Sequence, residues 1–95
     1  MNERNLTDHQ AHTLRHMLGI NDPSARVPEP YRNYAAVPAG CAEYERLYQL
    51  GLIERGAGPT DAFPYVFWRC TDLGRQLAID SHRRIRLKRD ARRSA

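Results

Sequence analysis

The sequence predicts a small α+β domain with three helices and a two- or three-stranded antiparallel sheet. Apolar residues recur at helical spacing in three segments of the chain. Two short segments, 52–55 and 65–70, have the composition of strands, and a loop rich in glycine and proline separates them. A length of 95 residues provides for one modest core, which is too small for an enzyme with a deep multilayered pocket.

The first helix is predicted over residues 8–18, because both of its ends carry capping signals. Thr7 precedes the segment and Gln10 follows three residues later, which is the pattern of a capping box. Gly19 followed by Ile20 is typical of a helix that ends on a left-handed glycine. The apolar residues of this segment share one side and predict a core stripe, which comprises Ala11, Leu14, Met17 and Leu18.

Residues 21–40 break the helical pattern, because prolines lack a backbone N–H and favour extended geometry in the residue before them. The prolines of this segment are Pro23, Pro28, Pro30 and Pro38. No long helix fits here. Within the segment, the sequence of Tyr31–Val37 predicts a short strand that its tyrosines anchor.

A second helix is predicted over residues 41–50, with Gly51 ending it. The residues expected on its inner face are Cys41, Tyr44, Leu47 and Tyr48. Its outer face comprises Ala42, Glu45, Arg46 and Gln49, with Glu43 at the margin. The helix is therefore amphipathic and should pack against the core along one side.

The strand at residues 65–70 should expose alternate side chains to opposite faces of the sheet. The residues expected to face the core are Val66, Trp68 and Cys70. Tyr65 and Phe67 then have two interpretations. If they are exposed, they form with Phe63 an apolar surface of the kind that marks interfaces. If the segment 31–37 covers them, they belong to the core, and we favour this second interpretation.

The last helix should begin after Thr71, whose side chain suits an N-cap, with Asp72 at the positive end of the helix dipole. Its predicted core stripe comprises Leu73, Leu77, Ala78, Ser81 and Ile85. Beyond residue 85 the same stripe would place cations in a core. We therefore expect a domain over residues 1–85 and a basic tail over residues 86–95, which leaves the body either frayed or helical in solvent.

The formal charge of +4 is unevenly distributed along the chain. Residues 81–95 carry +6, and residues 1–80 carry −2. The basic segment can contact nucleic-acid phosphates, bind an acidic protein partner, or form a solvated end of the chain. The candidate phosphate contacts are Arg83, Arg84, Arg86, Lys88, Arg89, Arg92 and Arg93, with Arg55 and Arg69 as secondary contacts.

Two short motifs flank the predicted hairpin, and they comprise Leu50, Gly51, Leu52, Ile53, Thr71, Gly74 and Arg75. With these motifs, the second half of the chain resembles the second half of winged-helix domains, as in MarR-type and PadR-type regulators. The resemblance implies a winged-helix-like fold in which the hairpin is the wing and helix 41–50 lies where a recognition helix reads DNA. The build is also similar to that of small uncharacterised phage or prophage proteins.

The sequence departs from the winged-helix pattern in two places. A full winged helix has a further helix before the recognition helix, and the proline-rich residues 21–40 stand there instead. Recognition helices use their N-terminal residues on base edges and phosphates, commonly through Arg, Lys, Asn or Gln. Helix 41–50 offers Ala42, Glu43 and Glu45 at that end, and carboxylates repel phosphate.

The remaining polar residues give no sign of catalysis, of a metal or of another cofactor. The histidines of the first helix, which are His9, His12 and His16, share an outer face, and we expect them to be solvated rather than to bind zinc. Cys41 and Cys70 stand alone and predict reduced thiols. Neither a signal peptide nor a membrane segment is expected, so we expect a cytoplasmic protein that does not bind membranes.

These observations predict a non-catalytic, nucleic-acid-associated regulatory or accessory protein of winged-helix build. The alternative is a protein-interaction module, phage-encoded on the weaker resemblance, that keeps the fold without reading DNA. The acidic residues of helix 41–50 favour the alternative, whereas the basic tail favours nucleic acid. Either function is compatible with a homodimer.

Overall fold

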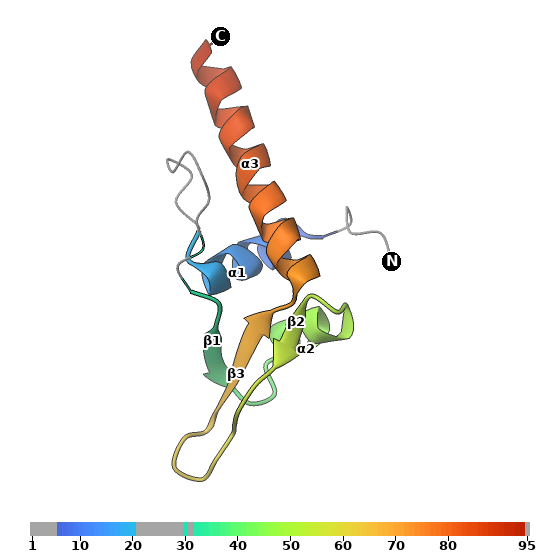
Figure 1. Cartoon of the computed structure of the whole chain (residues 1–95), viewed down its shortest axis with the longest axis vertical. Helices are drawn as coiled ribbons and strands as arrows, with labels where there is room; N and C mark the ends of the chain where they lie inside the picture. Colours follow the sequence, from blue (N-terminus) through green and yellow to red (C-terminus); the bar gives the residue numbers. More distant parts are fainter. Residues whose placement is uncertain (1–5, 21–29, 31, 95) are drawn as a thin grey trace.

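The structure is a computed structural model that describes residues 6–20, 30 and 32–94, with side chains through Lys88. Within these residues it confirms a small α+β domain of three helices and one three-stranded antiparallel sheet. Figure 1 shows the order along the chain, in which α1, β1 and α2 precede the hairpin of β2 and β3, and α3 follows.

Helix α1 spans Asp8–Leu18, as its capping signals predict. Thr7 Oγ1 accepts a hydrogen bond from the Gln10 N–H at 3.0 Å, and the Gln10 side chain accepts one from the Thr7 N–H at 3.0 Å. Gly19 ends the helix with a φ of 74°, and the N–H of Ile20 bonds back to the last turn. The predicted core stripe is buried in full and comprises Ala11, Leu14, Met17 and Leu18.

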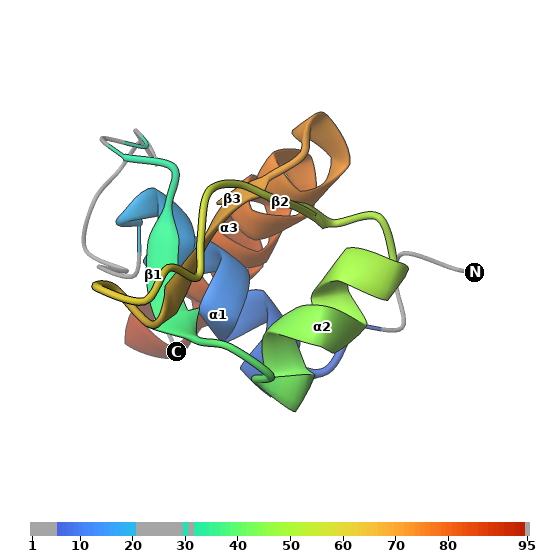
Figure 2. The same ribbon diagram turned by 90° about the horizontal axis from the view of Figure 1, so that it is seen from below.

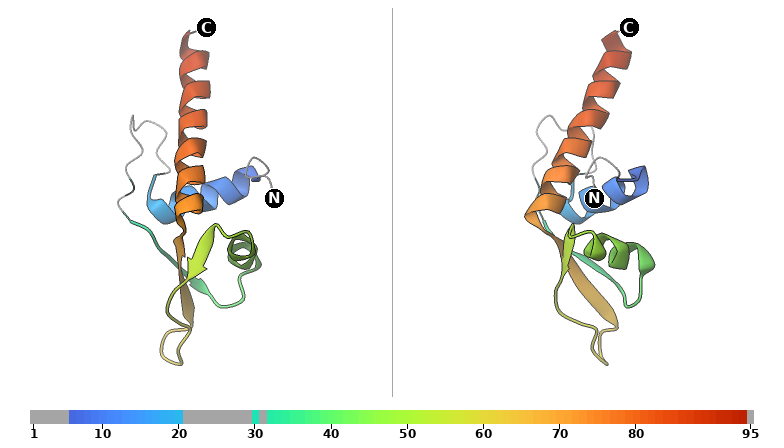
Figure 3. Two further views of the ribbon diagram at one scale, coloured as in Figure 1. Left: turned by 45° about the vertical axis from the view of Figure 1, so that its right-hand side comes forward. Right: turned by 90° about the vertical axis from the view of Figure 1, so that its right-hand side faces the viewer.

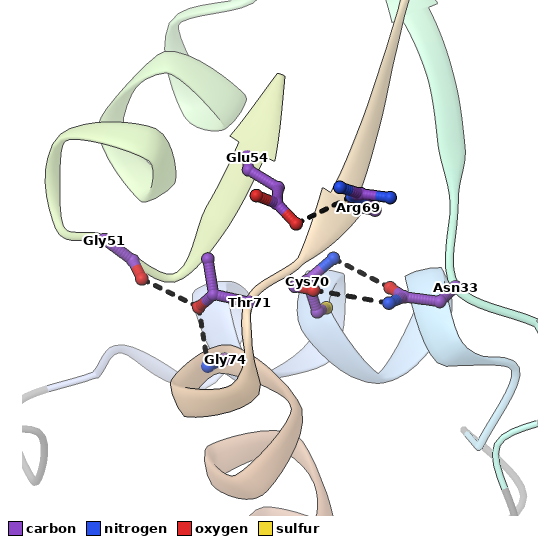
Figure 4. A network of polar contacts seen from close by, with 7 residues as sticks. All are labelled: Asn33, Gly51, Glu54, Arg69, Cys70, Thr71 and Gly74. Carbon is purple, nitrogen blue, oxygen red and sulfur yellow. Dashed lines mark hydrogen bonds and ion pairs between the residues drawn. The ribbon is translucent and has the colours of Figure 1, made fainter. Parts of the chain in front are cut away.

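The sheet has the strand order β1-β3-β2, and both pairs are antiparallel. Its strands are β1 at Ala35–Pro38, β2 at Ile53–Arg55 and β3 at Tyr65–Cys70. The strand predicted at 31–37 therefore exists but begins later, and Tyr31 itself lies outside the described residues. Asn33 explains the later start, because its side-chain amide bonds both backbone groups of Cys70 in place of a main-chain pair (Figure 4). Asn33 Oδ1 accepts from the Cys70 N–H at 2.7 Å, and Nδ2 donates to the carbonyl at 3.3 Å.

Alternate residues of β3 give the sheet one buried face and one outer face. The buried residues are those predicted, namely Val66, Trp68 and Cys70, each 2 to 5% exposed. Both α1 and α2 lie on the same side of the strands (Figure 2), and their apolar residues join this face in one core cluster. The Trp68 ring links the sheet to α2, since its centroid lies 6.5 Å from that of Tyr44 and 5.6 Å from that of Tyr48.

Helix α2 spans Ala42–Gln49, and Gly51 follows it with a φ of 76°, as predicted. Tyr44 and Leu47 are buried on the inner face. Tyr48, which we also predicted there, is 48% exposed, because only one side of its ring packs against Trp68. The inner face of α2 is thus narrower than its sequence suggests.

Helix α3 spans Asp72–Ser94 and begins at a tight junction with the turn that ends α2. The hydroxyl of Thr71 donates to the Gly51 carbonyl at 2.8 Å and accepts from the Gly74 N–H at 3.2 Å, as expected of an N-cap (Figure 4). A Cβ at Gly74 would lie 1.9 Å from the carbonyl oxygen of Leu52. Only glycine allows the first turn of α3 to approach the backbone of Leu52 so closely.

The close approach at Gly74 decides which side of α3 faces the core. The buried residues further along this side are Leu77, Ala78, Ser81 and His82. Leu73 and Ile85 were predicted in the core stripe, but each is 39% exposed. The prediction centred the core stripe on large apolar residues of the helix. The contact at Gly74 instead turns the helix so that the small residues Ala78 and Ser81 face the core. His82 is buried on the same side, and the sequence pattern missed it.

Replacing Trp68 with alanine tests the buried face of the sheet. The ring is 3% exposed and contacts both tyrosines of α2. Its loss should lower the free energy of unfolding by roughly 3–5 kcal/mol in chemical denaturation. The control is Tyr65→Ala on the same strand, where the side chain is 37% exposed and should contribute much less. Equal losses in the two variants would show that the core lies on the other face of β3.

Candidate nucleic-acid interface

The basic residues of α3 lie on a helix that projects from the body of the protein (Figures 1 and 3). The last buried residues described on this helix are Ser81 and His82. Beyond them the backbone stays helical through Ser94, without interruption at residue 86, where we expected the tail to begin. At about 1.5 Å per residue, the segment 83–94 adds roughly 18 Å of helix beyond the core.

Several of the predicted phosphate contacts are open to solvent. Arg83, Arg84 and Lys88 are exposed, whereas Arg86 is partly buried. The side chains of Arg89, Arg92 and Arg93 lie outside the described part of the structure. Among the described residues, none of the three exposed cations forms an ion pair. Their charge is therefore available to a partner from solution.

These cations are spread over roughly half of the circumference of α3 instead of forming one narrow face. Arg84 and Lys88 are one turn apart and share a side, whereas Arg83 and Arg86 project in other directions, because successive residues turn by about 100°. Leu87, between these groups, is 67% exposed. Such a helix attracts phosphate from several directions, but it presents no single surface that could follow a groove and read bases.

The two secondary candidates, Arg55 and Arg69, are engaged within the sheet. Arg69 Nε lies 2.6 Å from Oε1 of Glu54, its cross-strand neighbour. The guanidinium carbon of Arg55 lies 5.8 Å from the centroid of the Trp68 ring, at cation–π distance. Figure 1 shows the sheet at one end of α3 and the basic segment at the other. The structure thus does not bring these two arginines together with the cations of α3.

Glu43 is held by α1 instead of facing outward from the start of α2. Its Oε2 lies 3.0 Å from His9 Nε2, and its Oε1 accepts a hydrogen bond from the hydroxyl of Thr13. The hydrogen bond from Thr13 holds the pKa of the Glu43 carboxyl below its ordinary value, and the contact with His9 acts in the same direction. We expected the carboxylates of Glu43 and Glu45 at a surface that would read DNA, and for Glu43 this expectation is wrong. The exposed residues of α2 are Ala42, Arg46, Tyr48 and Gln49.

The outer face of the sheet carries an exposed aromatic cluster, which we define as Phe63, Tyr65 and Phe67. The ring of Phe63 lies 5.0 Å from that of Tyr65 and 5.5 Å from that of Phe67, measured between centroids. Phe63 is 42% exposed and Tyr65 is 37% exposed. We had favoured the interpretation in which the segment 31–37 covers these rings, and that is wrong. β1 pairs beside β3 within the sheet, so it cannot lie over the outer face.

A buried polar contact joins α1 to α3, and sequence reasoning missed it. Arg15 is only 9% exposed, and its Nη1 donates to Oγ of Ser81. Burial lowers the pKa of Arg15, the nearby Asp8 carboxylate raises it, and the Arg84 cation lowers it. The available signal was the position of Arg15 four residues after Ala11, which places a charged residue beside the apolar stripe.

The histidines and cysteines form no group of metal ligands in the described part of the chain. The histidines predicted to be solvated are exposed, and they are His9, His12 and His16. No group of three or more potential metal ligands occurs among the described residues. Both cysteines are free, and burial raises the pKa of Cys70 to about 12. At neutral pH this thiol stays protonated and is a poor nucleophile.

Comparisons with known protein families, with curated proteins and with solved structures return no match for this chain. Of the helices described here, none is long and apolar enough to cross a membrane.

The contact between Glu43 and α1 predicts a pH-dependent contribution to stability. Because folding lowers the pKa of Glu43, its contribution is complete above the ordinary carboxyl range and disappears as the pH falls through the lowered pKa. Glu43→Gln should reduce the free energy of unfolding at pH 7 by roughly 1 kcal/mol. The difference between variant and wild type should shrink at acidic pH.

The control for this prediction is Glu45→Gln, on the same helix. The carboxylate of Glu45 forms no hydrogen bond or ion pair with a described residue of α1, so this variant should change stability little at either pH. Urea denaturation at a neutral and an acidic pH measures both variants. A Glu43 effect that does not depend on pH would contradict the assignment of its carboxylate as the stabilising group.

Proposed function

We propose that this chain is a non-catalytic nucleic-acid-binding protein, with a regulatory or accessory role in the cytoplasm and a winged-helix-like build. The observation that carries the proposal is the projecting basic end of α3. There, Arg83, Arg84 and Lys88 are exposed and form no ion pair with any described residue. Cations on a projecting helix can approach a phosphate backbone without interference from the body of the protein.

The path of the chain around the hairpin supports the winged-helix-like part of this proposal. The end of α2, the hairpin of β2 and β3, and the start of α3 follow in the order that the resemblance implies. The two motifs of the resemblance meet at one junction, where Thr71 bonds to Gly51 (Figure 4). The motif spacing therefore has a structural reason, which is independent of any DNA contact.

Binding by this surface should be mainly electrostatic. The cations are spread over roughly half of the circumference of α3 and favour contacts to phosphates, which fix position but carry no sequence information. On α2, Arg46 and Gln49 are exposed and of types that read base edges, but they lie toward the C-terminal end of the helix. In the N-terminal half of α2 only Ala42 is exposed, whereas Glu43 and Glu45 are partly buried. We therefore propose weak sequence preference and strong salt dependence.

A protein-interaction module is the second candidate, and the aromatic cluster is the observation that favours it. The rings of Phe63, Tyr65 and Phe67 lie against one another on the sheet face that no described helix covers, with Phe63 and Tyr65 exposed and Phe67 partly buried. Clustered exposed aromatic side chains are common at protein interfaces. The hairpin loop 56–64 also carries Asp61 and no Lys or Arg, which is unfavourable for a wing that contacts phosphate.

A salt titration with duplex DNA tests the leading proposal. If the basic segment engages four to seven phosphates, log affinity should fall with log salt at a slope of roughly −4 to −6, because each neutralised phosphate contributes about −0.9. A triple variant with Arg83, Arg84 and Lys88 changed to glutamine should flatten this slope by roughly 2 to 3 units. Its fold should be unchanged, since all three side chains are exposed.

The matched control replaces Arg55 and Arg69, which are engaged within the sheet, and should leave most of the slope intact. Removal of residues from His82 onward is not a suitable variant, because His82 is buried. If the full chain shows no measurable affinity for duplex DNA even at low salt, the nucleic-acid proposal fails. A partner that binds through the aromatic cluster would then be the function to pursue.

A further inference from the structure

A small pocket lies where α1 crosses α3. Its volume is about 120 Å³, which is well above the roughly 10–15 Å³ that one water molecule needs on this measure. Its wall on α1 includes Asp8 and Arg15, and its wall on α3 includes Ser81, Arg84 and Lys88. We call this site the α1–α3 pocket. It is distinct from the surfaces of the sheet and from α2.

Among the described residues that line the α1–α3 pocket, cations outnumber carboxylates. Three cations line it, namely Arg15, Arg84 and Lys88, and the only carboxylate among its described lining residues is that of Asp8. Arg84 and Lys88 are one helical turn apart, so their side chains lie on the same side of α3. Like charges at this spacing repel each other, and an anion between them would remove the repulsion.

Hydrogen-bond donors in the pocket come from both helices. Arg15 is anchored by its contact with Ser81, whose Oγ accepts from Nη1 and so keeps its own hydroxyl hydrogen for another acceptor. Arg84 adds a planar guanidinium, which matches two oxygens of one oxyanion, and Lys88 adds a mobile point charge. Leu6 and Ile85 form an apolar wall, and low polarity at one side strengthens electrostatic contacts inside the site.

We propose that the α1–α3 pocket binds an oxyanion of the phosphate class. Arg84 and Lys88 hold it from α3, Ser81 donates a hydroxyl hydrogen, and the buried Arg15 supplies positive charge from α1. Asp8 opposes the anion and limits its affinity. Burial is the main reason why the pKa of Arg15 is lowered, and the Arg84 cation adds a smaller effect in the same direction, which an anion bound between the two guanidinium groups would offset.

The same chemistry can come from two sources, a free phosphate ester or a phosphodiester in a nucleic-acid backbone. The inference goes beyond the proposed function, because a free ligand would fill the pocket whether or not the chain binds DNA. If a nucleic-acid backbone supplies the phosphate, the pocket holds that one phosphate in a defined geometry. The other cations of α3 would contact phosphates without such a defined geometry.

The test is a titration of the full chain with inorganic phosphate at constant ionic strength, with chloride as the exchanged ion. Amide shifts of Ala11 and Ser81 in NMR spectra report on the pocket, and thermal unfolding reports on binding to the folded state. Wild type should show saturable shifts at these positions and a rise in melting temperature. A double variant, Arg84→Gln with Lys88→Gln, should bind phosphate at least about tenfold more weakly, because charge-assisted hydrogen bonds are lost.

Two further variants distinguish a specific phosphate site from a general effect of positive charge on phosphate binding. Arg83→Gln removes a cation from the adjacent position that does not line the pocket, so phosphate affinity should stay nearly unchanged. Asp8→Asn removes the opposing carboxylate and should strengthen phosphate binding several-fold, which a purely structural role for Asp8 does not predict. The proposal is overturned if phosphate causes no saturable change, or if Arg83→Gln weakens it as much as the double variant does.

Duplex DNA distinguishes the two sources. If a backbone phosphate occupies the pocket, saturating DNA should abolish the response to inorganic phosphate, and the double variant should lose more DNA affinity per charge than Arg83→Gln. If a free ester is the ligand, both variants should lose DNA affinity equally per charge while only the double variant loses phosphate binding. A chain that binds DNA but not phosphate would refute the pocket and leave the proposed function standing.

Discussion

The peptide backbone of Leu52 is the point on which the rest of the structure depends. Its N–H donates to the carbonyl of Leu47 and so ends α2, and its carbonyl accepts from the N–H of Thr71 at the end of β3. The same carbonyl lies so close to Gly74 that no side chain fits between them. One residue therefore joins the end of a helix, the base of the hairpin and the start of α3, which fixes the direction in which α3 leaves the body.

This direction separates the two exposed surfaces of the protein. The aromatic cluster lies on the outer face of the sheet, and the cations of α3 lie beyond the opposite end of the core (Figure 1). A nucleic acid held by α3 would leave the aromatic cluster free. An accessory protein that holds nucleic acid with one end and a protein with the other is consistent with this arrangement, and it would reconcile the two candidate functions.

Much of the fold could be predicted from local chemistry, because capping residues and alternating burial act over a few neighbours. Thr7, Gln10 and Gly19 predicted α1 to its ends, and the alternation around Trp68 predicted the buried face of β3. The errors arose where distant segments meet. The exposure of Leu73 depends on the close approach of Gly74 to Leu52, and the orientation of the Glu43 carboxylate depends on its contacts with α1. No rule of residue spacing along the sequence predicts these contacts. The candidate phosphate contacts of α3 could be predicted from their charge alone. The α1–α3 pocket could not be predicted, because it exists only where two helices distant in sequence cross.

The stability of a Gly74→Ala variant tests the central role of this junction most directly. In a helix, glycine to alanine ordinarily raises stability by about 0.5–1 kcal/mol, because alanine loses less backbone entropy on folding. Here the added Cβ would meet the carbonyl oxygen of Leu52 at 1.9 Å, so the start of α3 must move. We predict that chemical denaturation will show a clear loss of stability instead of a gain. A variant as stable as the wild type, or more stable, would contradict the account.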